Sequence, residues 1–172
     1  MTKRTMRWIA QGAALSVCLV GKAGLAQDTG AVDRHEPGKQ VVNIPYDAVK
    51  WQKLMPELGE RSPETAILHV DPQTKATQML LRVPKDTHVP LHWHSTNETH
   101  TVVKGTFIVE CDGQREVLNQ GSFNFMPAKM HHEAWTRPDE GALVFVTLSG
   151  AFDFQWVNGP PKAADIVGGT WR

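Results

Sequence analysis

Two histidines two positions apart are the first residues whose types and spacing could perform chemistry. His92 and His94 flank Trp93. In a β-strand, residues i and i+2 point to the same face, so the two imidazoles would project together into an interior. Glu98 follows after a Ser-Thr-Asn turn at 95–97, which would let the chain double back and present a carboxylate beside them.

A second histidine pair, His131 and His132, follows Pro127 further along the chain. Three imidazoles with one carboxylate suit a divalent transition metal such as Fe, Mn, Zn, Ni or Cu. Four protein ligands leave positions open for water or substrate on an ion that accepts five or six, which permits catalysis. An isolated His-x-His pair is more often a compositional accident, so a barrel without metal stays an alternative.

Short apolar runs separated by turn residues predict an all-β fold. Asp112-Gly113 predicts a hairpin, because type I′ turns need positive φ at both central residues. No helical period of a dozen residues occurs, and many short strands indicate a sandwich or barrel. The predicted strands cover residues 66–70, 76–83, 89–94, 98–104, 106–110, 115–118, 123–126, 133–136, 142–149 and 152–157.

These motifs together resemble the cupin superfamily. The segment from His92 to Glu98, followed by Gly105, resembles the first cupin motif, and Gly121, Pro127 and His132 resemble the second. The resemblance implies a single-domain double-stranded β-helix, a jelly-roll barrel that is often dimeric, with a metal in its mouth. The stretch 124–128 and the later Trp135 resemble, more narrowly, the cupin domain of the ChrR anti-sigma factor.

The resemblance implies His92, His94, Glu98 and His132 as metal ligands. Family spacing selects His132 over its neighbour, and strand alternation then sends His131 to the opposite face. Asp86 and Lys129 stand where the motifs expect glycine, and Thr136 where they expect asparagine. A turn can accept Asp86, whereas the turn at Lys129 must either avoid positive φ or accept strain.

His100 lies two residues after Glu98 and should therefore also point inward. It could donate a hydrogen bond to Glu98 or act as a general acid or base near the ion. It could equally be a core histidine satisfied by a backbone carbonyl. His88, before Pro90, reads as a solvated or rim residue.

Aromatic residues do not by themselves indicate a substrate. Trp93 should face outward, since it lies between two inward histidines. The phenylalanines are expected in the core, which a barrel requires whatever its ligand. They are Phe123, Phe125, Phe145, Phe152 and Phe154.

The first 26 residues predict a secretory signal peptide. A basic head precedes an apolar stretch from Trp8 to Val20, and Gly24-Leu25-Ala26 suggests cleavage after Ala26. The apolar stretch is too short for a membrane anchor, which needs about 20 apolar residues. We expect a periplasmic or secreted protein without membrane attachment, with an arm over 27–50 and the barrel over 51–172.

Removal of this leader leaves an acidic chain. It takes Lys3, Arg4, Arg7 and Lys22 but no acid, so 14 basic residues remain against 18 acidic ones, a net charge near −4. That balance argues against nucleic-acid binding. Cys111 is then the one cysteine left, which excludes an intramolecular disulfide and a Cys-x-x-Cys redox motif.

Three functions fit these residues. The first is a metal-dependent enzyme for oxygen-dependent oxidation or isomerisation of a small molecule. The second is a non-catalytic cupin that binds or senses a small ligand. The third is a structural or interaction barrel braced by its metal, and a homodimer is compatible with each.

Overall fold

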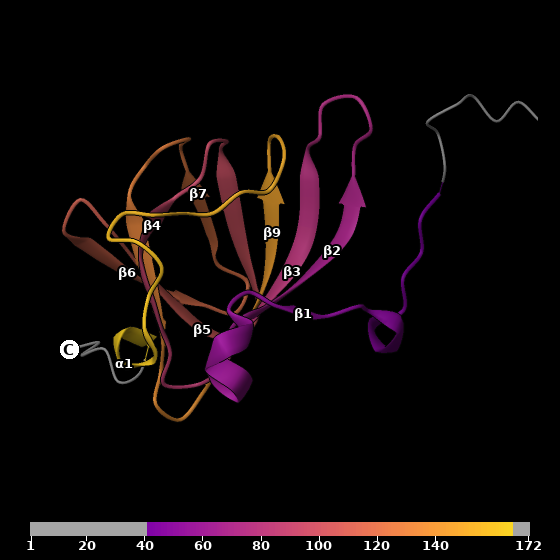
Figure 1. The fold of residues 1–172 in the computed structure, drawn as a ribbon. Helices are drawn as coiled ribbons and strands as arrows, with labels where there is room; N and C mark the ends of the chain where they lie inside the picture. Colours follow the sequence, from indigo (N-terminus) through magenta and orange to yellow (C-terminus); the bar gives the residue numbers. More distant parts are fainter. Residues whose placement is uncertain (1–40, 167–172) are drawn as a thin grey trace, which may run out of the picture. The chain divides into compact units, whose positions relative to one another are not determined.

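The computed structural model describes residues 41–166, and ten antiparallel strands dominate them. The strands are β1 (Gln52–Lys53), β2 (Glu64–Val70), β3 (Thr77–Val83), β4 (His88–Trp93), β5 (Glu98–Cys111), β6 (Gln114–Asn119), β7 (Phe123–Met126), β8 (His132–Thr136), β9 (Ala142–Leu148) and β10 (Gln155–Trp156). The helical elements are η1 (Tyr46–Ala48), η2 (Pro56–Arg61) and α1 (Ala163–Ile166). The predicted all-β jelly-roll class is confirmed (Figure 1).

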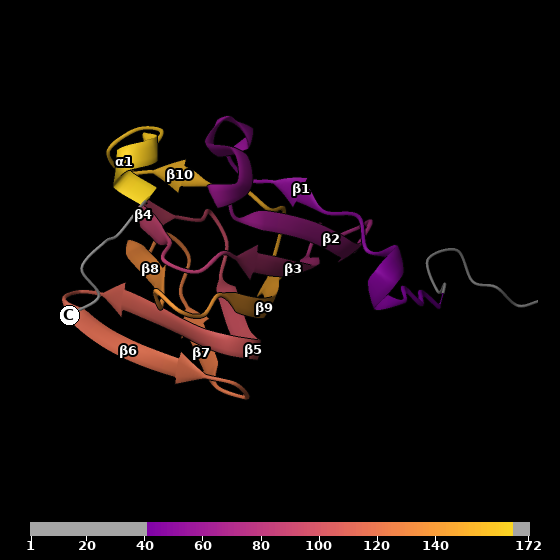
Figure 2. The same cartoon turned by 90° about the horizontal axis from the view of Figure 1, so that it is seen from below.

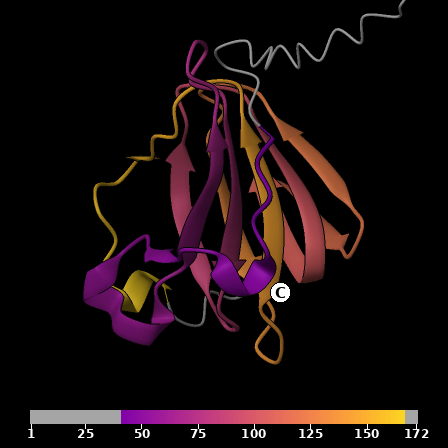
Figure 3. The same cartoon turned by 90° about the vertical axis from the view of Figure 1, so that its right-hand side faces the viewer.

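Strand β5 belongs to two half-sheets that face each other. Its start pairs with β9 and β7, and β9 continues through β3 and β2 to β1; we call these strands the first half-sheet. Its end pairs with β8 and β6, and β8 continues through β4 to β10; these strands are the second half-sheet. Figure 3 shows the strands of the barrel from the side.

The bend in β5 lies at Gly105, where two separate strands were predicted. Gly105 has φ of 80°, and a Cβ there would lie 2.0 Å from the carbonyl oxygen of Gly141. The glycine bends the strand without ending it, because Gly105 pairs with Ala142 of β9 and Phe107 with Thr136 of β8. The prediction of two strands was therefore wrong.

Three turns contain residues with the positive φ values that the sequence analysis considered. Asp112 and Gly113 both have positive φ, 51° and 72°, as the hairpin between β5 and β6 requires. Asp86 and Lys129 also have positive φ, 52° and 64°, so both turns accept the unfavourable conformation without glycine.

The core lies between the half-sheets and is mainly aliphatic. Its buried members include Met79, Val102, Phe107, Val144 and Val146. No helix within residues 41–166 is long and apolar enough to cross a membrane.

Two phenylalanines expected in the core are on the surface. Phe123 and Phe125 are 62% and 52% exposed. Period-two alternation holds in β7, but the inward positions belong to Asn124 and Met126, which pair with His100 and Glu98. The alternation fixes which residues share a face, whereas tertiary pairing decides which face is buried.

Other predictions about the chain ends have mixed outcomes. A strand was predicted over 152–157, but only β10 forms, since Asp153 bonds to residues next to β4. The predicted signal peptide and residues 27–40 of the predicted arm lie outside the described residues. The rest of that arm, residues 41–50, contains η1 and is largely exposed.

Candidate metal centre

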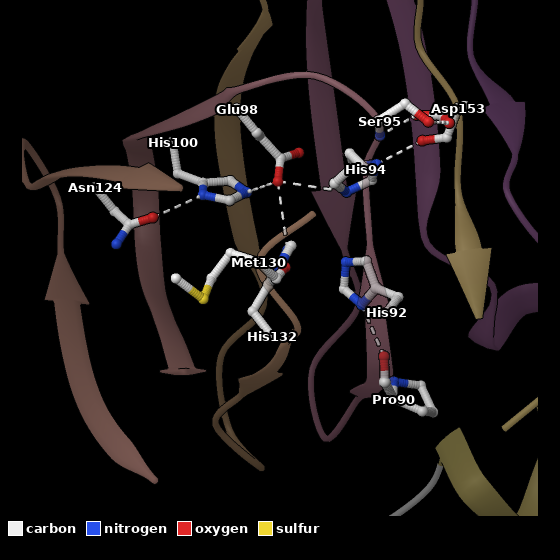
Figure 4. A network of polar contacts seen from close by, with 10 residues as sticks. All are labelled: Pro90, His92, His94, Ser95, Glu98, His100, Asn124, Met130, His132 and Asp153. Carbon is white, nitrogen blue, oxygen red and sulfur yellow. Dashed lines mark hydrogen bonds and ion pairs between the residues drawn. The ribbon is translucent and has the colours of Figure 1, made fainter. Parts of the chain in front are cut away.

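Three histidines from the second half-sheet converge inside the barrel. His92 lies on β4, His94 directly follows that strand, and His132 begins β8 opposite His92. All three are buried, and one ring nitrogen of each lies within 4.8 Å of the others (Figure 4). The alternation argument for His92 and His94 is therefore confirmed, and the three are placed to bind a metal ion.

Backbone carbonyls fix the orientation of each of these rings. Nδ1 of His92 bonds to the Pro90 oxygen at 2.7 Å, and Nδ1 of His132 bonds to the Met130 oxygen at 3.0 Å. Nδ1 of His94 bonds to the Asp153 oxygen at 2.5 Å. Since a carbonyl can only accept, Nδ1 carries the proton and Nε2 keeps its lone pair for a metal.

Glu98 supplies a carboxylate from the opposite half-sheet. Its Oε2 lies 3.3 Å from Nε2 of His94 and 3.3 Å from Nε2 of His132. Glu98 is 4% exposed, and Oε2 has no hydrogen-bond partner. A buried carboxylate oxygen without a partner is costly, so these donors fit a divalent ion bound between them.

The electrostatics of the cluster favour the protonation states that metal binding needs. Burial holds the pKa of His92 well below its ordinary value and lowers that of His94 as well, which keeps both imidazoles neutral. Burial raises the pKa of Glu98, but the nearby histidines, His100 foremost, outweigh it and hold that pKa well below the ordinary value. Neutral imidazoles and an ionised carboxylate are the forms that coordinate metals.

His100 lies behind Glu98, on the same strand and pointing inward as predicted. Its Nε2 is 3.4 Å from Oε2 of Glu98, and its Nδ1 is 3.2 Å from Oδ1 of Asn124 on β7. Burial lowers the pKa of His100, but attraction to Glu98 outweighs this and raises it. The alternative of a core histidine bonded to a backbone carbonyl is wrong, because the partner of Nδ1 is the side chain of Asn124.

The remaining histidines near the motifs lie outside the centre. His131 is exposed while its neighbour His132 is 2% exposed, so the choice between them agrees with the structure. His88 is half-buried rather than solvated. It bonds to Glu133 at 2.8 Å and to the Asp165 carbonyl at 3.0 Å, and it stacks on Trp135.

Asp153 is a site residue that the sequence reasoning missed. Its carbonyl orients His94, and its carboxylate accepts hydrogen bonds from the Ser95 amide at 2.9 Å and the Ser95 hydroxyl at 2.5 Å. The chain before β10 is thereby joined to the end of β4 beside a predicted ligand. No local motif signals this, because 59 residues separate Asp153 from His94.

A mainly apolar pocket opens onto the cluster. Phe107, Phe152 and Phe154 line it together with the four predicted ligands and His100. The centres of water-sized spheres can occupy about 30 Å³ inside it. This space suffices for an ion with one or two waters. The predicted ligands therefore face a small space rather than solid core.

Solved structures of similar fold include enzymes. KdgF from Halomonas sp. is 17% identical, with a TM-score of 0.53, over 64% of this chain and 94% of that one. The DMSP lyase DddQ from Ruegeria pomeroyi is 15% identical, with a TM-score of 0.58, over 67% and 64%. The polyketide cyclase RemF from Streptomyces resistomycificus is 17% identical, with a TM-score of 0.59, over 73% and 91%.

The sequence itself also matches a family. Residues 79–149 match the family described as Cupin domain, and this range contains all four predicted ligands. No curated protein matches the chain. The narrower resemblance to ChrR stays a prediction. The family match and the jelly-roll fold agree that the part of the chain that holds the centre, residues 79–149, is a cupin domain.

Proposed function

We propose that the protein is a metal-dependent enzyme that isomerises a small molecule at a centre formed by His92, His94, His132 and Glu98. One observation carries the proposal above the others. Three buried imidazoles whose Nδ1 atoms bond to carbonyls each bring one ring nitrogen within 4.8 Å of the others, and two of them, His94 and His132, lie 3.3 Å from a buried carboxylate oxygen that has no hydrogen-bond partner. This donor set suits a divalent first-row metal, whose identity the donors leave open among Fe, Mn, Zn, Ni and Cu.

A bound ion would supply Lewis acidity, polarising a substrate oxygen and making a neighbouring C–H bond more acidic. The chain would supply the proton transfer. His100 can hold or deliver a proton at Nε2, since Asn124 fixes its Nδ1 and Glu98 faces its Nε2. Proton transfer beside a polarised oxygen is what an isomerisation requires.

The pocket favours catalysis over a purely structural metal. A bracing ion is closed off by its protein ligands, whereas this cluster faces a lined space on one side. DddQ and RemF are named as a lyase and a cyclase, and both names describe conversions of small molecules. The fold alone does not fix a reaction, so the site residues must carry the proposal.

Metal analysis combined with two assays tests the proposal. Elemental analysis of the purified protein should give close to one divalent ion per chain. Incubation with small ketones and phenols in D₂O should then exchange a carbon-bound proton without consuming oxygen. Oxygen uptake would instead support the oxidation that the same donor set permits, and absence of both reactions from the metal-loaded protein would leave a binding module.

We also propose that the protein is exported and loses its first 26 residues. The basic head and the short apolar stretch support this. Fractionation of a bacterial host that expresses the full chain should place the product outside the cytoplasm, beginning at Gln27. A product that retains Met1 in the cytoplasm would contradict it.

A further inference from the structure

The walls of the metal pocket are mainly apolar. Leu54, Met79 and Leu81 line one side, and Phe107, Phe152 and Phe154 line the other. Its ionisable groups are the four histidines and Glu98, and no Lys or Arg occurs among the described residues that line it. Away from the metal, a ligand bound here would therefore meet mainly apolar surface, with Thr65 and His100 as the polar exceptions.

The entrance lies where the half-buried wall residues meet. Met79 and Phe107 are 2% exposed, whereas Leu54, Leu81, Phe152 and Phe154 are only partly buried. Leu54 directly follows β1, and Phe154 directly precedes β10. Figure 2 shows β1 and β10 on the same side of the barrel. A ligand must pass between these aliphatic and aromatic side chains to reach the ion.

Aromatic rings lie beside two of the histidines at the entrance. The Phe154 ring stacks on the ring of His92, with centroids 4.1 Å apart and planes 14° apart. Phe152 lies 6.2 Å from His94, centroid to centroid. These rings add apolar surface beside the histidines, and the open space of about 30 Å³ limits the occupant to a small molecule.

The lack of lysine and arginine in the pocket wall has a cost for anions. A phosphate group carries several charged oxygens, and an ion at the cluster can coordinate only one or two of them. The others would be stripped of water against leucine and phenylalanine, with no lysine or arginine in the wall to replace it. A neutral compound with one oxygen would place that oxygen on the ion and leave no charged oxygen against the apolar wall.

We infer that the site selects small, uncharged compounds that present one oxygen to the metal, the class of phenols, enols and small ketones. This inference rests on the proposed metal centre. It goes further by naming the substrate class and the side chains that select it, Leu54 and Leu81 on one side of the entrance and Phe152 and Phe154 on the other.

Cobalt-loaded protein provides the test, because the visible spectrum of Co²⁺ reports a change in its ligands. Phenol and phenyl phosphate are titrated separately, and phenol should bind at least about tenfold more tightly. Leu81→Lys places a cation at the entrance and should shift the ratio toward phenyl phosphate by about tenfold or more. Leu80→Lys is the matched control, since Leu80 lies next along β3 outside this pocket and should keep the wild-type ratio.

The possible results separate the inference from the proposed centre. Failure of the wild-type protein to bind cobalt stoichiometrically would remove the proposed centre itself. Stoichiometric cobalt with tighter binding of phenyl phosphate, or with no binding of either probe, would overturn the inference alone. So would an unchanged ratio in Leu81→Lys. If that variant does not fold by circular dichroism, Leu54→Lys at the same entrance takes its place with the same expected shift.

Discussion

The two half-sheets hold their parts of the centre in different ways. The second half-sheet contributes His92, His94 and His132, and a backbone carbonyl fixes each ring. The first contributes Glu98, whose Oε2 faces other side chains without a hydrogen bond. Carbonyl positions follow from the chain path, so the histidines are fixed before a metal binds. The carboxylate oxygen of Glu98 instead has no hydrogen bond to hold it and faces the Nε2 atoms of three histidines.

This difference predicts the largest effect for a change among the histidines. His94→Ala removes a metal donor whose ring a carbonyl already orients, and it leaves Glu98 with fewer partners. Metal content should therefore fall below roughly a tenth of an ion per chain. Elemental analysis after dialysis measures this. His69→Ala, which removes an exposed histidine on β2, should retain the full content. A His94→Ala protein with one ion per chain would refute the assignment.

Glu98→Gln should have a smaller but still large effect. The amide keeps the size of the side chain while it removes the negative charge, so the three histidines can still hold an ion. We expect metal affinity to fall about 100-fold, measured by competition with a chelator. Glu133→Gln, which alters a carboxylate bonded to His88 away from the centre, should leave affinity unchanged. Equal affinities in both variants would remove Glu98 from the ligand set.

His100 separates metal binding from proton transfer within the first half-sheet. His100→Gln keeps a donor near Glu98 but removes the titratable ring. It should retain metal within about tenfold and lower the rate of proton exchange in D₂O about 100-fold. His100→Leu removes the donor too, and should weaken metal binding further. A His100→Gln protein with the full exchange rate would make this residue purely structural.

A change at Asp153 tests whether metal binding by the second half-sheet depends on the bonds that hold the carbonyl beside His94. Asp153→Ala keeps the carbonyl that orients His94 but loses both bonds to Ser95, so the segment holding that carbonyl is less restrained. Metal affinity should fall about tenfold in the same chelator competition. Asp139→Ala, which changes an exposed acid in the turn before β9, is the control and should match the wild type. Equal affinities would show that the carbonyl holds its place unaided.

The sequence could predict those parts of the fold and site that depend on near neighbours. The i, i+2 relation placed His92 and His94 on one face, and Asp112-Gly113 identified its hairpin from two residues. Motif spacing brought His132 to the same group. These signals act within a strand or a turn, where chain geometry alone decides the outcome.

The parts that the sequence did not reveal depend on distant pairings. Asn124 meets His100 across 24 residues, and Asp153 meets His94 across 59. The strand pairing of β7 with β5 also decided that Asn124 faces inward while Phe123 and Phe125 face solvent. Hydrophobicity alone favoured the opposite faces, because apolar side chains are normally buried.

The smallest effect is expected at the histidine adjacent to a ligand, and it tests strand alternation most directly. His131 and His132 differ by one position, yet one is exposed and the other is 2% exposed. His131→Ala should therefore leave metal content at one ion per chain and change the free energy of unfolding by no more than about 0.5 kcal/mol. His132→Ala should lose the metal. If His131→Ala instead lost it, β8 would have to be shifted by one residue, and the pairing of His132 with His92 would be wrong.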